Sequence, residues 1–247
     1  MKISKLEPKY IKKDNPRIGL ITLASDFRIE KDFNNVIYGK DIDLYCNRIK
    51  CYNPLTNETL EKMANDITKV TEDILPDQKL DCVAYGCTSG TIAAGYKSIY
   101  DKVNLAKPNT KVTTPITSAI NALKNLKINK VSIFTPYTDE INQSVINYFK
   151  NEKIEISELS YFDIASDLDI GKVDPEYLFD VLSNKDLSLS DALFVSCTSL
   201  PVLSIIKDLE KKLGKIILSS NQTLIWDTLK QIKYKNKVEG YGELFDN

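Results

Sequence analysis

Two cysteines occupy matching places in two similar stretches of the sequence. Residues 81–90 read DCVAYGCTSG and residues 191–200 read DALFVSCTSL. In each stretch an Asp opens an apolar run, Cys87 or Cys197 follows six positions later, and Thr-Ser comes next. A catalytic group on each side of one reacting carbon, about 3–3.5 Å from it, places the two sulfurs roughly 7–10 Å apart. We therefore expect Cys87 and Cys197 to be an acid/base pair that faces one cleft.

A helix is expected after each cysteine, over residues 91–103 in the first stretch and 202–213 in the second. Each thiol would then lie at the carboxyl end of a strand and beside the start of a helix. Backbone N–H groups and the positive end of the helix dipole favour a thiolate at such a place. The pattern therefore predicts two activated thiols.

The sequence contains no histidine. Its absence excludes a Ser-His-Asp triad, a Cys-His pair and any imidazole metal site within this chain. The five cysteines include no Cys-x-x-Cys pair, which argues against a disulfide framework or a structural zinc site. Cys82 lies inside an apolar strand and is expected to be structural, and we assign no role to Cys46 or Cys51. No metal or organic cofactor is expected.

Charge and hydropathy restrict the partners of the protein. The chain has 247 residues, with 33 basic and 34 acidic side chains and a net charge of −1. No overall field attracts nucleic acid or an anionic membrane, and no apolar run approaches the roughly 18–20 residues of a membrane helix. The first residues lack the apolar stretch of a signal peptide. We expect a cytoplasmic protein with a small carboxylate-bearing metabolite as its ligand, no nucleic acid or membrane partner, and a homo-oligomeric assembly.

Strand and helix patterns alternate along the chain, and the order begins again after about 110 residues. Strands are expected over residues 17–26, 41–49, 81–89 and 111–115, and again over 130–139, 154–159, 191–199 and 215–221, with helices between them. This alternation predicts an α/β fold with two pseudo-symmetric lobes, each a roughly four-stranded parallel sheet flanked by helices. We assign residues 1–117 and 219–247 to the first lobe and residues 118–218 to the second, with the active site in the cleft between them.

Small, polar or reactive residues follow most of the expected strands. Ligands of parallel sheets bind outside the carboxyl ends of the strands. The candidate residues at those ends are Ser25, Asp26, Cys87, Thr88, Ser89, Thr114, Tyr137, Thr138, Cys197, Thr198, Ser199 and Asn221.

Five segments of the chain resemble a known superfamily. They are residues 83–90, 113–117, 135–137, 193–199 and 213–222. The sequence is similar there to the Asp/Glu racemase superfamily, and more closely to its branch of maleate cis–trans isomerases, arylmalonate decarboxylases and ectoine-utilisation racemase-like proteins. The resemblance extends over nearly the whole chain.

The resemblance implies a cofactor-free enzyme that holds its substrate between two lobes. In the family, one thiolate removes a proton or adds to a double bond, and the other thiol delivers a proton on the opposite face. Decarboxylases of the branch keep only the second-lobe cysteine, so the presence of both implies an isomerase or racemase. By the same pattern, hydroxyl and N–H groups around Thr88, Ser89, Thr198 and Ser199 would bind a carboxylate and its enediolate-like transition state.

Two positions depart from the maleate isomerases. Those enzymes have Asn at the end of the first strand and again about thirty residues past the tyrosine that matches Tyr137, where this chain has Asp26 and Asp167. Carboxylates there would repel a dianion and attract an amine or amidine, which favours a racemase-like enzyme acting on an amino or amidino acid, as in ectoine utilisation. Asp26 could instead point away or cap the following helix. The alternatives are a maleate isomerase in which Cys87 adds to the alkene, an arylmalonate-type decarboxylase, and a non-catalytic two-lobe solute-binding protein.

Overall fold

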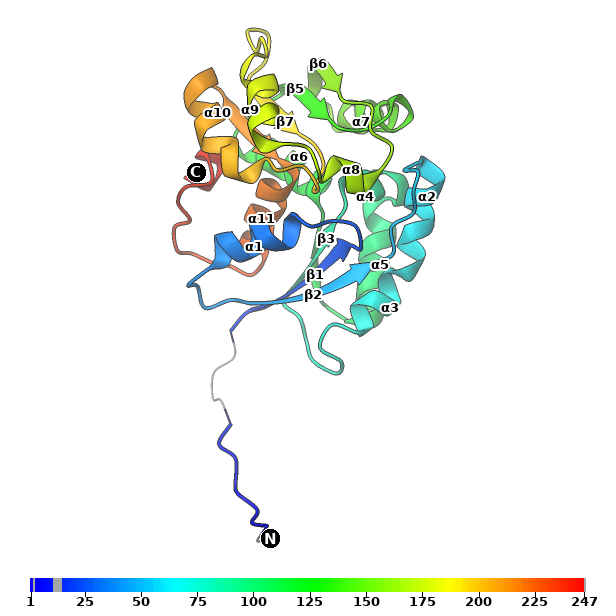
Figure 1. Ribbon diagram of the computed structural model, residues 1–247, viewed down its shortest axis with the longest axis vertical. Helices are drawn as coiled ribbons and strands as arrows, with labels where there is room; N and C mark the ends of the chain where they lie inside the picture. Colours follow the sequence, from blue (N-terminus) through cyan, green and yellow to red (C-terminus); the bar gives the residue numbers. More distant parts are fainter. Residues whose placement is uncertain (2, 11–14, 247) are drawn as a thin grey trace.

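The computed structural model describes residues 1, 3–10 and 15–246, and within them it contains two parallel four-stranded sheets (Figure 1). The first sheet has the order β2-β1-β3-β4 and the second the order β6-β5-β7-β8. Their strands are β1 (Arg17–Leu23), β2 (Asp43–Ile49), β3 (Cys82–Gly86) and β4 (Lys111–Thr113), then β5 (Lys130–Thr135), β6 (Glu155–Tyr161), β7 (Ala192–Val195) and β8 (Ile216–Ser219). The expected α/β fold with two similar sheets is confirmed.

The cysteine strands β3 and β7 occupy equivalent inner positions of the two sheets. Each lies between the first and the fourth strand of its own sheet, and every residue of both is buried. A parallel strand covered by helices on both faces is buried on both sides, which explains why these stretches are almost continuously apolar. Cys87 directly follows the carboxyl end of β3, and Cys197 follows that of β7 after one residue, Ser196.

Helices connect the strands and cover the sheets. They are α1 (Ile29–Ile37), α2 (Asn57–Met63), α3 (Ile67–Glu72), α4 (Thr88–Ala94), α5 (Tyr96–Ala106), α6 (Pro115–Asn125), α7 (Asp139–Asn151), α8 (Asp167–Ile170), α9 (Pro175–Ser183), α10 (Ile206–Leu213) and α11 (Ser220–Gln231). Three short 3₁₀ helices, η1 (Ala64–Asp66), η2 (Leu203–Ile205) and η3 (Glu243–Phe245), complete the set. None of the helices in the described part of the chain is long and apolar enough to cross a membrane.

The last helix of the chain packs on the first sheet. α11 begins with a capping box, in which the Ser219 hydroxyl accepts from the backbone N–H of Gln222 and the Gln222 side chain accepts from Ser219 N–H. It then packs against α6, β3 and β4. The chain thus returns from the second sheet to the first, and the division into two lobes at the residues named above stays a prediction.

Two of the expected helices are divided. The helical segment expected between the second and third strands forms three pieces, α2, η1 and α3, and it ends at Glu72. The helix expected over 91–103 begins earlier, at Thr88, and breaks at Gly95, where α4 gives way to α5. Gly95 has a φ of 78°, a conformation that residues with a side chain rarely adopt.

The helix expected over residues 202–213 forms as η2 and α10, but it begins six residues after Cys197, so the expectation that each cysteine lies beside the start of a helix is wrong for Cys197. Residues 198–202 form a turn, and the chain becomes helical only at Leu203. Pro201 explains the delay, because a proline disfavours helical conformation in the residue before it and cannot donate a backbone hydrogen bond. The two cysteine stretches therefore differ in backbone geometry after the cysteine.

Candidate active site

Cys87 links β3 to α4 and is the N-cap residue of that helix. Its backbone is extended, with φ −146° and ψ 114°, and its Sγ accepts a hydrogen bond from Gly90 N–H at 3.2 Å. The Ser89 hydroxyl lies 3.9 Å from the same sulfur. Only 3% of Cys87 is exposed. The first turn of α4 therefore surrounds one buried thiol with donors.

Cys197 follows β7 and has a strained backbone. Its φ is 106°, which is unusual for a residue with a side chain, and it is 6% exposed. Its N–H donates to the Ser220 hydroxyl at 2.9 Å, and that hydroxyl is 2.9 Å from the hydroxyl of Thr88. This chain of hydrogen bonds connects the helix of the first thiol to the backbone of the second.

The two thiols share two ionisable neighbours. Burial raises the pKa of Tyr137 well above its ordinary value, and the proximity of Cys197 and Cys87 raises it further. The Asp167 carboxylate raises the pKa of Cys87 and that of Cys197. The Ser196 hydroxyl donates to Tyr137 Oη at 3.4 Å. The structure thus brings both cysteines, Tyr137 and Asp167 into one site.

Asp167 connects residues from three parts of the chain. Its two carboxylate oxygens accept hydrogen bonds from the hydroxyls of Ser25, at 2.5 Å, and Ser199, at 2.8 Å. Its backbone N–H donates to Asn53 Oδ1 at 3.2 Å. Burial raises the pKa of Asp167, although the two hydroxyl donors act in the opposite direction. Its position places Ser25 and Ser199 in the site as well.

Asp26 both caps a helix and faces the site. Its Oδ1 accepts from the N–H groups of Arg28 and Ile29 at 2.7 and 3.0 Å, next to the start of α1, which is the alternative that the sequence left open. Its Oδ2 is buried and has no hydrogen-bond partner. Burial raises the pKa of Asp26, and the charge of Asp26 in turn raises the pKa of Cys197. Asp26 therefore lies close to the second thiol.

Thr198 and Asn221 form a pair beside the second thiol. The Thr198 hydroxyl donates to the carbonyl of Gly86 at 3.3 Å, which joins the loop after β7 to the end of β3. Asn221 Nδ2 donates to the Thr198 carbonyl at 2.9 Å and to Asp32 Oδ2 at 2.8 Å. These two acceptors fix the orientation of the amide, and Asn221 Oδ1 is buried without a partner.

Two of the predicted residues are not joined to this group. The Thr114 hydroxyl pairs with that of Thr117 at 2.8 Å. Thr138 is the N-cap residue of α7, and its side chain makes no capping hydrogen bond. Within the described residues, no side-chain hydrogen bond connects Thr114 or Thr138 to the residues around the thiols.

Three residues that the sequence analysis left without a role lie at or next to the site. They are Cys51, Asn53 and Tyr85, whereas Ser220 belongs to the last expected strand end, over residues 215–221. Burial raises the pKa of Cys51 to about 11, and Ser25, Asp167 and Asp26 are among its neighbours. Cys51 and Asn53 follow the carboxyl end of β2, so the rule that identified the other strand ends could have found them.

The expectation of two activated thiols is wrong for this closed structure. Burial raises the pKa of both cysteines, far enough to outweigh the N–H of Gly90 at Cys87 and the N–H of Ser199 at Cys197. Loss of water around a thiolate is more unfavourable here than the backbone hydrogen bonds to the two sulfurs are favourable.

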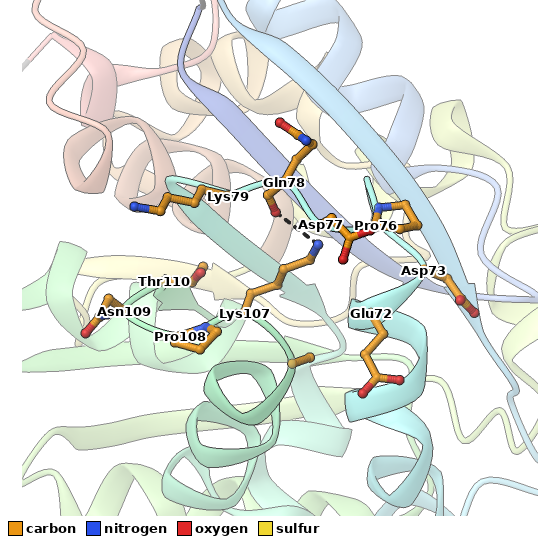
Figure 2. Close-up of a pocket in the computed structure, with 11 residues that line it drawn as sticks. Glu72, Asp73, Pro76, Asp77, Gln78, Lys79, Lys107, Pro108, Asn109 and Thr110 are labelled. Carbon is orange, nitrogen blue, oxygen red and sulfur yellow. Dashed lines mark hydrogen bonds between the residues drawn. The ribbon is translucent and has the colours of Figure 1, made fainter.

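A separate cavity of about 540 Å³ lies at the opposite end of the first sheet (Figure 2). Residues 72–79 and 106–110 line it, just before the amino ends of β3 and β4. Figure 2 shows Lys107 reaching toward Gln78, where its ammonium donates to the carbonyls of Gln78 at 3.0 Å and Leu75 at 2.7 Å. These bonds hold two loops together, and the cavity contains none of the predicted site residues.

Known proteins resemble this chain along most of its length. The maleate isomerase of Geobacillus stearothermophilus is 26% identical over 243 residues, which cover 92% of this chain and 96% of that protein. The maleate isomerase of Alcaligenes faecalis is 27% identical over 180 residues, or 69% of this chain and 70% of that protein. The arylmalonate decarboxylase of Bordetella bronchiseptica is 28% identical over 137 residues, or 54% of this chain and 57% of that protein.

Solved structures share the fold. A cysteine-to-alanine variant of the maleate isomerase from Pseudomonas putida S16, with maleate, matches with a TM-score of 0.85 at 20% identity and covers 94% of this chain and 98% of that chain. A Nocardia farcinica maleate cis–trans isomerase mutant with a covalently bound succinylcysteine intermediate gives 0.85 at 20% identity, with 93% and 98% covered.

The comparisons confirm the resemblance to the maleate isomerase and arylmalonate decarboxylase branch of the Asp/Glu racemase superfamily, and with it the expectation of an isomerase-type enzyme. A family model described as arylmalonate decarboxylase matches residues 53–245. The chain belongs to this arylmalonate decarboxylase family.

Proposed function

We propose that the protein is a cofactor-independent isomerase that uses Cys87 and Cys197 on opposite faces of a carbon next to a carboxylate. One observation carries the proposal: two buried thiols at equivalent strand ends share Tyr137 and Asp167 as neighbours. Cys82 differs in its place, since it lies inside β3 rather than at a strand end and contacts the Thr113 hydroxyl.

The proton balance of a racemisation needs only the two sulfurs. One thiolate takes the α-hydrogen, and the electron pair of the broken C–H bond moves into the carboxyl group to give an enediolate. The opposite thiol then delivers its proton to the other face of the carbon. At the end the two sulfurs have exchanged protonation states, so the enzyme is ready for the reverse direction.

Donors around the thiols would stabilise the enediolate. The Ser89 hydroxyl and the Gly90 N–H lie beside the Cys87 sulfur, and the Ser199 N–H lies beside that of Cys197. Fixed donors in a site without bulk water stabilise developing oxyanions more strongly than water does. The raised pKa of both thiols suits this role as well, because a more basic thiolate is a stronger base toward a C–H bond.

The acids of the site favour a substrate that carries a positive group. Asp26 Oδ2 has no partner, and Asp167 lies close enough to raise the pKa of Asp26. An ammonium or amidinium group would pair with Asp26 and remove the repulsion between the two carboxylates. We therefore propose an amino or amidino acid as the substrate, such as an ectoine-derived amino acid, racemised at its α-carbon.

Maleate isomerisation is the second candidate, and the relatives at 26% and 27% identity favour it. Here the Cys87 thiolate adds to the alkene and the electron pair moves into the neighbouring carboxyl group. Rotation about the new C–C single bond follows, and loss of the thiolate gives fumarate. This route forms and breaks one C–S bond and exchanges no α-hydrogen of an amino acid.

One set of assays separates the candidates. We expect the purified protein to exchange the α-hydrogen of its amino-acid substrate for deuterium in D₂O, as measured by NMR and mass spectrometry. Efficient conversion of maleate to fumarate without any such exchange would favour the second candidate. Binding of a carboxylate metabolite without exchange or isomerisation would instead support a solute-binding protein.

Replacing either thiol should abolish turnover. We expect Cys87→Ser and Cys197→Ser each to lose activity while keeping the melting temperature, because a hydroxyl is far too weak an acid to replace a thiol. The matched control is Cys82→Ala, which should lower the free energy of unfolding by about 1–2 kcal/mol and leave the rate unchanged. Full activity of Cys197→Ser would contradict the two-thiol mechanism.

A further inference from the structure

The hydroxyl of Tyr85 is buried without a hydrogen-bond partner. Tyr85 lies in β3, is fully buried, and its Oη makes no hydrogen bond. A buried hydroxyl without a partner destabilises the folded protein, because it gives up its hydrogen bonds to water and gains none in return. A phenylalanine would fill the same space without that cost, so the hydroxyl has a use that the closed structure does not display.

Tyr85 and Cys87 lie two positions apart along one strand direction, and their polar atoms converge. Residues at positions i and i+2 of a strand face the same side of the sheet. A Cβ added to Gly90 would lie 2.8 Å from Cys87 Sγ and 3.0 Å from Tyr85 Oη. Both polar atoms therefore border one point above Gly90, which also explains why only glycine fits at that position.

We propose that the Tyr85 hydroxyl donates a hydrogen bond to Cys87 Sγ once that sulfur has lost its proton, and so positions the thiolate for reaction. A neutral thiol is a weak acceptor and already receives the N–H of Gly90. The thiolate accepts several donors strongly, so the unused hydroxyl acquires a partner only in the charged state. Tyr85 is a positioning residue, and its role rests on the proposed use of Cys87 as a base or nucleophile.

Two other groups near Cys87 act as donors to its sulfur, the Gly90 N–H at 3.2 Å and the more distant Ser89 hydroxyl, and the remaining neighbours do not. Asp167 and Cys51 both raise the pKa of the Cys87 thiol, and Tyr137 has its hydroxyl beside Ser196 and Cys197. Ser89 lies 3.9 Å from Sγ. Asp167 and Cys51 thus destabilise the Cys87 thiolate, and a hydrogen bond from Tyr85 would stabilise it.

Alkylation of Cys87 tests the proposal without any substrate. The rate of reaction with iodoacetamide follows the thiolate fraction, and peptide mapping by mass spectrometry reports each cysteine separately. We expect Tyr85→Phe to slow alkylation of Cys87 about tenfold at every pH from about 7 to 9, which corresponds to a rise of about one unit in the pKa of that thiol. The rate at Cys197 should stay within twofold, and the melting temperature should be unchanged or higher.

The controls separate a positioning role from a structural one. Tyr148→Phe removes a partly buried hydroxyl on α7, away from β3, and should leave both cysteine rates unchanged. Loss of packing in Tyr85→Phe would lower the melting temperature and speed the alkylation of both cysteines, which would contradict the proposal. An unchanged rate at Cys87 would also overturn it. Because the readout is the thiol itself, failure of the proposed isomerase activity would leave this result intact and distinguishable.

Discussion

Burial dominates the chemistry of the single residues in this site. Asp26, Asp167, Cys87 and Cys197 all have raised pKa values, and loss of water is the largest cause in each case. The hydrogen bonds that act in the opposite direction do not cancel it. A substrate that brings its own charge into the site therefore changes the protonation of several groups together.

The charge of Asp26 should decide which substrates are accepted. Asp26→Asn keeps an oxygen to accept the N–H groups of Arg28 and Ile29 and replaces the free carboxylate oxygen by an amide donor. We expect kcat/KM for an amino acid to fall and kcat/KM for a dicarboxylate to rise, because a few kcal/mol of repulsion become attraction at an effective dielectric near ~20. The measurement is the ratio of the two values. An unchanged ratio would show that Asp26 serves only as a helix cap.

The sequence could predict most of the candidate site residues because one topological rule groups them, whereas Asp167, at the start of α8, came from the family resemblance. Parallel strands end at one edge, so Ser25, Tyr137 and Thr198 could be grouped without a structure. Tyr85 could not, because it reads as an ordinary apolar strand residue, and only the coordinates show that its hydroxyl is unpaired. The thiol pKa values were misjudged because a sequence does not report how completely a site closes.

At the scale of elements, the second cysteine turn departs from the first. Cys87 has an extended backbone at a helix start, whereas Cys197 has a φ of 106° in a turn held by Ser220. Pro201 gave a local signal for the delayed helix, but the strain at Cys197 depends on contacts from the start of α11. Such strain is common where a reactive group must be held in one orientation.

A pair of variants should measure that strain. Cys197→Ala and Cys197→Gly both remove the thiol, but only glycine adopts a positive φ freely. Relief of about 1–3 kcal/mol of strain is partly offset by the greater freedom of glycine in the unfolded chain, which costs about 0.4–1 kcal/mol. We expect the glycine variant to be the more stable by about 1 kcal/mol in urea unfolding. Greater stability of the alanine variant would show that the turn is relaxed.

The contact between α1 and α11 should make stability depend on pH. Burial raises the pKa of Asp32 from 3.8 to about 7, while Asn221 donates to its carboxylate. The folded protein therefore keeps this proton in a range where the unfolded chain has released it, so this group's contribution to stability is lost as the pH rises from about 4 to about 7.

Asp32→Asn should remove that dependence, because an amide oxygen still accepts from Asn221 and carries no charge. We expect the free energy of unfolding of the variant to exceed that of the wild type by an amount that grows across this pH range, as measured in urea at about pH 4.5, 5.5 and 7. The nearby charge of Asp26 also raises the pKa of Asp32, so the comparison reports Asp32 together with its coupling to Asp26. A constant difference would contradict the raised pKa.

On the scale of the whole molecule, a few long-range contacts keep the site closed. The Ser25 hydroxyl reaches Asp167 across 142 positions of sequence, and Arg28 Nη2 donates to the carbonyl of Gly171 at 3.1 Å. In Figure 1 the segment around α8 lies between the two sheets, above the end of β1. Local patterns predicted both sheets, but contacts of this span depend on how the sheets meet, which no short window of sequence contains.

Opening of the α8 segment should control access to the thiols. Both cysteines are almost fully buried, so a substrate needs the structure to open, and we expect the contacts of α8 and the adjoining Gly171 to separate. Arg28→Ala removes the donor to Gly171, and loss of a charged hydrogen bond of about 1.5 kcal/mol should raise the open population about tenfold. We expect iodoacetamide to react several-fold faster with both Cys87 and Cys197.

The control Lys97→Ala, which removes an exposed ion pair with Asp101 on α5, should leave both rates unchanged. Equal rates in Arg28→Ala and the wild type would mean that solvent reaches the thiols by another path, and a faster rate at one cysteine alone would mean that the two sulfurs do not share one entrance.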